Sequence, residues 1–125
     1  MPGLIPHLLA GSLLFAIGRI AFRTYFKDDQ KFKKTLFLAA VCLTFSILPD
    51  FFLGIYYLTH IEPESVLMPY QIFSHYILAP IAAGVLFLLA FLFDTKRRPL
   101  WIMGATALVL HVIMDSLFIE TSYLW

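Results

Sequence analysis

The chain has 125 residues, of which 61% are hydrophobic and 14% charged, and its mean hydropathy is +0.85. A soluble domain of this length could not cover so much apolar surface, so the composition excludes an ordinary soluble protein. The net charge of +1 gives no reason to expect a nucleic-acid partner, and the single cysteine, Cys42, cannot form a disulfide within the chain. The sequence therefore predicts one integral membrane domain over residues 1–125, with the lipid bilayer as its partner.

Four apolar stretches are long enough for spanning helices, each of which needs about 20 residues. In chain order they cover residues 4–22, 36–58, 70–93 and 100–119. The connections between them are short, which favours antiparallel neighbours. We therefore predict an all-α fold, an antiparallel bundle of four transmembrane helices.

The basic residues predict how this bundle is oriented. All nine lie in or beside the connections after the first and third stretches: Arg19, Arg23, Lys27, Lys31, Lys33, Lys34, Lys96, Arg97 and Arg98. The opposite side carries only acidic charges, Glu62, Glu64 and Glu120. The positive-inside rule then predicts both termini outside and both basic connections in the cytoplasm. This pattern favours a multi-pass protein of the cytoplasmic (inner) membrane.

Apart from Arg19, whose long side chain can reach the inner surface, five ionisable residues lie inside the predicted spans: His7, Asp50, His75, His111 and Asp115. An isolated charge at the centre of a bilayer costs about 2.5–3.5 kcal/mol, so their presence needs a physical reason. At about 1.5 Å per residue, all five are expected about 5–12 Å from the outer ends of their helices. They come from all four helices, whose directions alternate, yet they fall in one half of the membrane. His111 and Asp115 also share a helix face, being four residues apart.

Three imidazoles and two carboxylates at one depth predict a divalent metal site. This ligand set suits zinc, and also manganese, iron or nickel. Pro49 and Pro80 tend to kink their helices, which would widen a water-filled vestibule toward the outside. The alternative is a buried polar network that only joins the helices. We interpret His60, Glu62 and Glu64 as a solvated loop.

Small residues in the spans are expected where helices pack closely. They are Gly11, Gly18, Ala79, Ala82, Ala83, Gly84, Gly104 and Ala105.

Four short motifs follow one another along the chain: PHLLAG at 6–11, LPD at 48–50, FSH at 73–75 and HVIMD at 111–115. In order and spacing this series resembles the small membrane-bound metal-dependent hydrolases, a group that includes a LexA-regulated bacterial inner-membrane protein. The resemblance implies that the five ionisable residues are metal-binding or catalytic. The chain departs from the family pattern at Phe51 and Phe52, where many members have an acidic residue and a histidine, and at Gln71 and Ile72.

The leading functional hypothesis is a metal-dependent hydrolase with its site in the outer half of the bilayer. Three or four of the five residues would hold the metal, and one carboxylate, Asp50 or Asp115, would act as general base or support a histidine. A shallow site beside lipid favours an amphiphilic substrate, such as a phospholipid or a lipid-linked ester. The alternatives are a metal- or proton-binding carrier or sensor, and a non-enzymatic structural membrane protein.

Overall fold

The computed structural model describes residues 4–59 and 64–117, and within them the backbone is helical with no strand. The α-helices are α1 (Leu4–Ala21), α2 (Lys31–Ile47), α3 (Phe51–Thr59), α4 (Glu64–Phe73), α5 (Ala79–Leu88) and α6 (Arg98–Leu117). Shorter 3₁₀ or π segments join them: η1 (Arg23–Phe26), η2 (Leu48–Asp50), η3 (Ser74–Leu78), η4 (Leu89–Phe93) and η5 (Thr95–Arg97). A helix satisfies its own backbone hydrogen bonds, which lipid cannot do for it.

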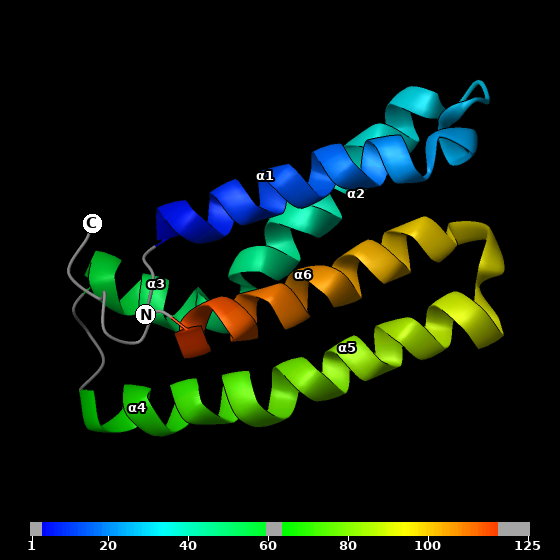
Figure 1. Ribbon diagram of the computed structural model, residues 1–125. Helices are drawn as coiled ribbons and strands as arrows, with labels where there is room; N and C mark the ends of the chain where they lie inside the picture. Colours follow the sequence, from blue (N-terminus) through cyan, green and yellow to red (C-terminus); the bar gives the residue numbers. More distant parts are fainter. Residues whose placement is uncertain (1–3, 60–63, 118–125) are drawn as a thin grey trace.

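The long helices form an antiparallel bundle that confirms the predicted fold class. In the part of the chain that the structure describes, four helical stretches are long and apolar enough to cross a membrane: Leu4–Ala21, Lys31–Asp50, Pro69–Phe93 and Thr95–Leu117. Helix α6 lies at the centre and contacts α1, α2 and α5. The start of α1 and the end of α6 share one end of the bundle, and the connections α1–α2 and α5–α6 share the other (Figure 1).

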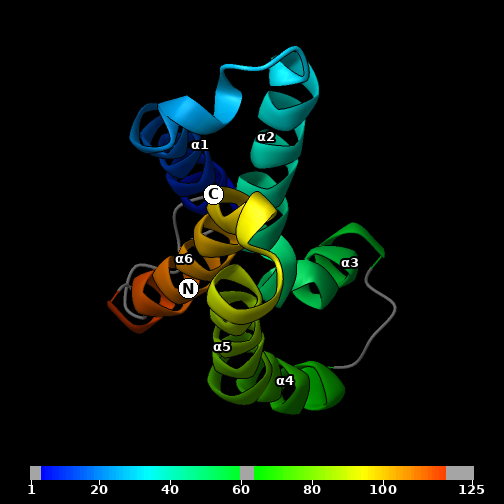
Figure 2. The same cartoon turned by 90° about the vertical axis from the view of Figure 1, so that its right-hand side faces the viewer.

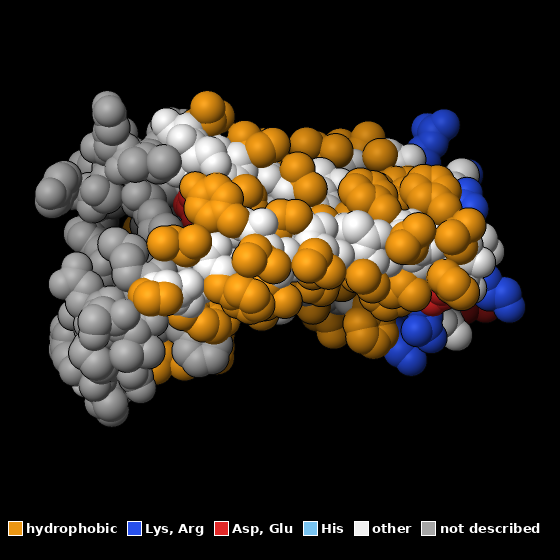
Figure 3. Space-filling view, turned by 90° about the horizontal axis from the view of Figure 1, so that it is seen from below, with side chains coloured by type: hydrophobic (Ala, Val, Ile, Leu, Met, Phe, Trp, Pro, Cys, Tyr) orange, Lys and Arg blue, Asp and Glu red, His pale blue; other side chains and the backbone are white. Residues whose placement is uncertain are grey.

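The surface of the bundle matches a lipid environment. Apolar side chains point outward along its length, with Leu9 66% exposed, Ile20 75% and Leu92 68%. Lys and Arg side chains gather at the end that holds the α1–α2 and α5–α6 connections (Figure 3). An apolar belt bounded by charge is the pattern of a multi-pass membrane protein, whereas monomeric soluble proteins rarely expose large apolar patches.

The second predicted helix differs from the observed one. A continuous helix over 36–58 is wrong, because the chain breaks at Leu48–Asp50 and α3 leaves the axis of α2 and projects to one side of the bundle (Figure 2). Pro49 has no N–H and its ring clashes with the preceding turn, which weakens the α-helix at this point. The second span is still long enough to cross a membrane, because α2 begins at Lys31 rather than at residue 36.

The other predicted bounds agree within a few residues. Helix α1 ends at Ala21, the third span begins at Pro69, and α6 begins at Arg98. The structure describes α6 only to Leu117, so the predicted end at Ile119 lies outside the described residues, as do His60, Glu62 and Glu120. Glu64 opens α4.

Glycines allow α1 and α6 to approach their neighbours closely. A Cβ on Gly11 would stand 2.7 Å from Ser46 Oγ and 3.0 Å from the Cys42 carbonyl oxygen of α2. A Cβ on Gly104 would meet the Phe45 ring at 3.1 Å. The close-packing prediction is wrong for Gly84, which is exposed and where a Cβ would have no neighbouring atom within 4 Å among the described residues.

We expect Gly11→Ala to lower the free energy of unfolding by about 1–3 kcal/mol, because overpacking pushes two backbones apart. The melting temperature of the purified protein in detergent measures this. Gly84→Ala is the matched control and is expected to leave the melting temperature unchanged or to raise it, since alanine favours helix and meets nothing there. Equal losses in both variants would contradict the close approach of α1 to α2.

Candidate metal centre

Five side chains from four segments meet near one end of the bundle. Helix α1 supplies His7, η2 supplies Asp50, η3 supplies His75, and α6 supplies both His111 and Asp115. Every residue singled out from the sequence is therefore brought into one cluster. The three histidines and Asp115 are 1–6% exposed, and the Asp50 side chain is 15% exposed.

The proline break positions Asp50. The 3₁₀ turn of η2 follows Ile47, whose backbone leaves the regular helix at φ −119°. Asp50 thus stands at the end of the second span, and its predicted depth of about 12 Å inside a longer helix is wrong. Ser74 Oγ reaches across to the Pro49 carbonyl oxygen at 3.1 Å and fastens η2 to η3.

A π-helical turn positions His75. In η3 the N–H of Ala79 donates to the Ser74 carbonyl oxygen, five residues back. The next residue is Pro80, which lacks a donor and cannot continue regular α-helical bonding. Wide turns of this kind are frequent at functional sites. Here the wide turn leaves both Ser74 and His75 buried against the other helices.

Each carboxylate touches three imidazoles through their Nε2 atoms. Asp115 lies 3.2 Å from His7, 2.5 Å from His75 and 3.2 Å from His111. Asp50 lies 3.5, 3.3 and 3.6 Å from the same three nitrogens. The rings of His7 and His111 stack, with centroids 4.0 Å apart. The side chains are thus arranged around one shared space.

Backbone carbonyls fix the tautomer of two histidines. His111 Nδ1 donates to the Ser46 carbonyl oxygen at 2.6 Å, and His75 Nδ1 donates to the Gln71 carbonyl oxygen at 2.8 Å. Because a carbonyl only accepts, Nδ1 of each ring carries the hydrogen and Nε2 of the neutral ring offers a lone pair. Metal-binding histidines are commonly held in this way.

The cluster needs positive charge at its centre. Nε2 of His75 and Nε2 of His111 are 2.9 Å apart, so in the neutral rings two lone pairs face each other beside two carboxylates. Apart from the ion-pair contacts between the rings and the carboxylates, both nitrogens of His7 and both carboxylate oxygens of Asp115 are buried without a hydrogen-bond partner among the described residues. Each such atom costs about 1–3 kcal/mol when left unpaired. A cation in the shared space would satisfy them together.

The donor set fits a metal ion. His7, Asp50, His111 and Asp115 each offer one ligand atom, and these four atoms lie within 4.8 Å of one another. Nitrogen and carboxylate oxygen donors in this number suit zinc and other first-row divalent metals. His75 borders the same space and contacts both carboxylates. The group could therefore hold a metal ion.

Sequence reasoning missed the residues that support the cluster. Gln71 is buried, donates through Nε2 to Asp50 Oδ1, and accepts from His75 through its carbonyl. Ser46 is buried and supplies the carbonyl that holds His111. The spacing offered one signal, because Gln71 lies four residues before His75 on the same helical face. Nothing in the sequence indicated Ser46.

No family model, curated protein or solved structure matches this chain.

Proposed function

We propose that this protein is a membrane-embedded metal-dependent hydrolase that acts on a lipid or a lipid-linked ester or phosphoester. The convergence of five ionisable side chains from four segments, all but Asp50 buried, carries the proposal, with two imidazoles oriented by backbone carbonyls. A bound zinc ion, or a related metal, would polarise the scissile carbonyl or phosphoryl group and make water a better nucleophile. The resemblance of the four motifs to membrane-bound hydrolases suggests the same reaction class.

The two carboxylates differ in a way that suggests separate roles. Asp115 is enclosed, with three imidazole nitrogens within 3.2 Å, which suits a ligand. Asp50 stands at the helix break, is the more exposed of the two, and is oriented by Gln71. As general base, Asp50 would take a proton from the attacking water while the water oxygen bonds to the carbonyl carbon or phosphorus. The bond to the leaving oxygen then breaks, and that oxygen receives the proton.

A small hollow beside the cluster supports a substrate with an apolar part. It has a volume of about 160 Å³ and lies between the η2 break and the third span. Its lining is mostly apolar, from residues such as Leu48, Leu78 and Ala82. Pro49 and Ser74 belong to the same lining, and each is the chain neighbour of a cluster residue. Part of an acyl chain placed here would bring an ester group toward Asp50 and His75.

The core below the cluster favours a hydrolase over a carrier. Between the cluster and the basic end, buried apolar side chains fill the space among α1, α2 and α6; they are Leu14, Phe26, Leu38, Cys42, Leu100, Met103 and Ala107. A proton or ion path across the membrane needs polar groups or water along its length. Within the described residues, the His, Asp, Lys and Arg side chains of the spans lie either in the cluster or at the basic end, with this apolar layer between the two groups.

The test is metal content measured together with hydrolysis. We expect the purified protein to carry metal after incubation with zinc, and to hydrolyse phospholipids or short-chain esters in mixed micelles. A chelator should remove the metal and the activity together, and zinc should restore both. Protein that takes up no metal would contradict the proposed centre, whereas bound metal without hydrolysis of any ester would contradict only the enzymatic proposal.

We propose that the metal centre lies on the outer side of the cytoplasmic membrane, because the basic connections favour the cytoplasmic side. Lys96→Cys should therefore resist a membrane-impermeant maleimide in intact cells and react after the membrane is permeabilised. The native Cys42 is fully buried, so it should contribute little background. Labelling of Lys96→Cys in intact cells would show that the protein has the opposite orientation.

A further inference from the structure

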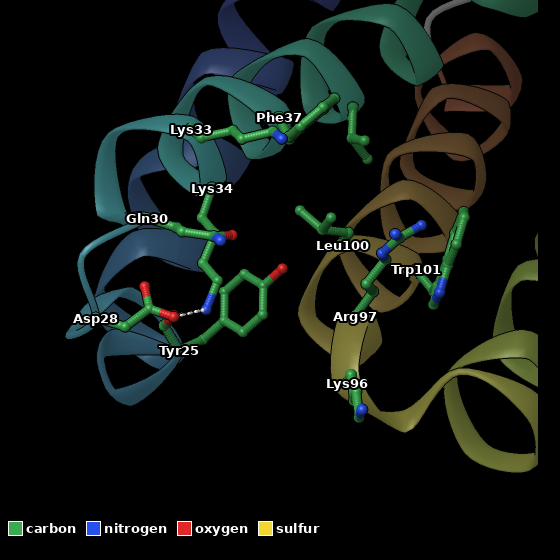
Figure 4. Close-up of a pocket in the computed structure, with 11 residues that line it drawn as sticks. Tyr25, Asp28, Gln30, Lys33, Lys34, Phe37, Lys96, Arg97, Leu100 and Trp101 are labelled. Atoms are coloured by element: carbon green, nitrogen blue, oxygen red, sulfur yellow. Dashed lines mark hydrogen bonds and ion pairs between the residues drawn. The ribbon is translucent and has the colours of Figure 1, made fainter.

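A second cavity lies at the opposite end of the bundle from the metal centre. Its volume is about 570 Å³, and it opens between the start of α2 and the start of α6 (Figure 4). Along α2, Lys33 at its mouth lies about 25 Å from Asp50 and Val41 at its inner end about 14 Å, and no residue of the metal centre lines it. It therefore has no part in the proposed hydrolysis.

The charges in this cavity are mainly positive. Four cationic side chains line it against one carboxylate, that of Asp28. Asp28 is already paired, since Lys34 Nζ lies 2.5 Å from its Oδ2, and this hydrogen bond lowers the pKa of the Asp28 carboxyl. Within the part of the chain that the structure describes, Lys33 and Lys96 form no salt bridge, although the Lys33 ammonium lies 6.0 Å from the Phe37 ring centroid.

Arg97 adds a third cation that is only loosely paired. Its Nε atom lies 3.8 Å from Asp94 Oδ2, which also accepts a hydrogen bond from Trp101 Nε1 at 3.2 Å. The Arg97 side chain is 67% exposed, so solvent screens this long contact. Lys33, Lys96 and Arg97 thus leave uncompensated positive charge at the mouth of the cavity.

The deeper wall of the cavity is apolar. Phe37 lies one helical turn below Lys33, and Val41 a further turn below, about 12 Å from Lys33 along α2. Leu100 and Trp101 face them from α6 (Figure 4). Cations at the membrane surface above an apolar wall match the two parts of a phospholipid. A free phosphate or an acidic peptide would leave the apolar wall unused.

We propose that this cavity binds an anionic phospholipid from the leaflet on the basic side of the membrane. The phosphate lies at the mouth beside Lys33, Lys96 and Arg97. An acyl chain follows Phe37, Val41 and Leu100 toward the bilayer core. The proposal is independent of the metal centre and of hydrolysis.

Native mass spectrometry of the full chain, released from nanodiscs, tests the proposal. The nanodiscs contain equal amounts of phosphatidylglycerol and phosphatidylcholine with the same acyl chains. We expect retained phosphatidylglycerol to predominate. The double variant Lys33→Gln with Lys96→Gln should lose about 30-fold of this preference, since each cation near an anionic surface contributes about fivefold. Equal retention of the two lipids by the unaltered protein would overturn the proposal.

The matched control is Lys27→Gln with Lys31→Gln, which removes the same charge at the same end but outside the cavity lining. It should keep the preference within about twofold, because both side chains are exposed and lie outside the lining, where water weakens their attraction to a bound phosphate. A loss as large as that of the first pair would show general attraction to the surface and overturn the site.

Two further arms separate a lipid from a free anion. Val41→Trp fills the space beside the apolar wall without altering a charge, and it should therefore reduce retention of phosphatidylglycerol. Inorganic phosphate, added in excess, should leave the bound lipid in place. Displacement by phosphate, or full retention by Val41→Trp, would indicate a site for a simple anion and contradict the proposed lipid.

Discussion

Replacing His111 with alanine is expected to remove the metal from the purified protein. The change deletes the Nε2 atom that lies 2.9 Å from His75 and 3.2 Å from Asp115, while both carboxylates stay in place. It also leaves the Ser46 carbonyl oxygen without its donor. Loss of a residue that supports a ligand reduces metal affinity by about 10–100-fold, and loss of a ligand itself should reduce it further. Metal bound per chain after dialysis, measured by elemental analysis, gives the result.

Thr106→Ala is the matched control for this experiment. Thr106 lies on the same helix, α6, and among the described residues its hydroxyl bonds only the Ile102 carbonyl one turn back. This variant should keep its metal. Helical content and elution from a sizing column would show whether His111→Ala still folds. A folded His111→Ala variant with unchanged metal content would contradict the proposed centre, because its ring stands between the other ligands.

Much of the site could be predicted because a membrane restricts where polar residues can stand. A helix has a fixed rise per residue, so the depth of each ionisable side chain follows from its distance to the end of a span. This was enough to bring together His7, His75, His111 and Asp115, which lie well inside regular or nearly regular helix. The same calculation gave the wrong depth for Asp50, since it assumed that the helix continues to residue 58.

The remainder depended on tertiary structure that sequence periodicity does not contain. Proline weakens a helix at a known place, but whether the chain bends, forms a π turn or breaks is decided by the partners of the freed backbone groups. At Pro49 the chain breaks, and its carbonyl bonds Ser74. Before Pro80 it forms a π turn instead. The role of Gln71 depends on both events, because they bring its amide to Asp50.

The second large effect is expected for Asp50→Asn, which should lower the hydrolysis rate by about 10²–10⁴-fold while the metal stays bound. Asparagine has nearly the same shape and can still accept from Gln71, but it cannot take a proton from water. Three imidazoles and the Asp115 carboxylate would remain, which is a sufficient set for zinc. Rate and metal content are measured on the same preparation.

Asp115→Asn is the comparison that separates the two roles. Its carboxylate is surrounded by all three histidines, so its loss should release the metal and the activity together. Release of the metal by Asp50→Asn as well would make Asp50 a ligand, in agreement with its place among the four atoms that lie within 4.8 Å of one another. The general base would then have to be sought elsewhere. The proton transfer is assigned to Asp50 only if the Asp50→Asn variant keeps its metal and its hydrolysis rate falls.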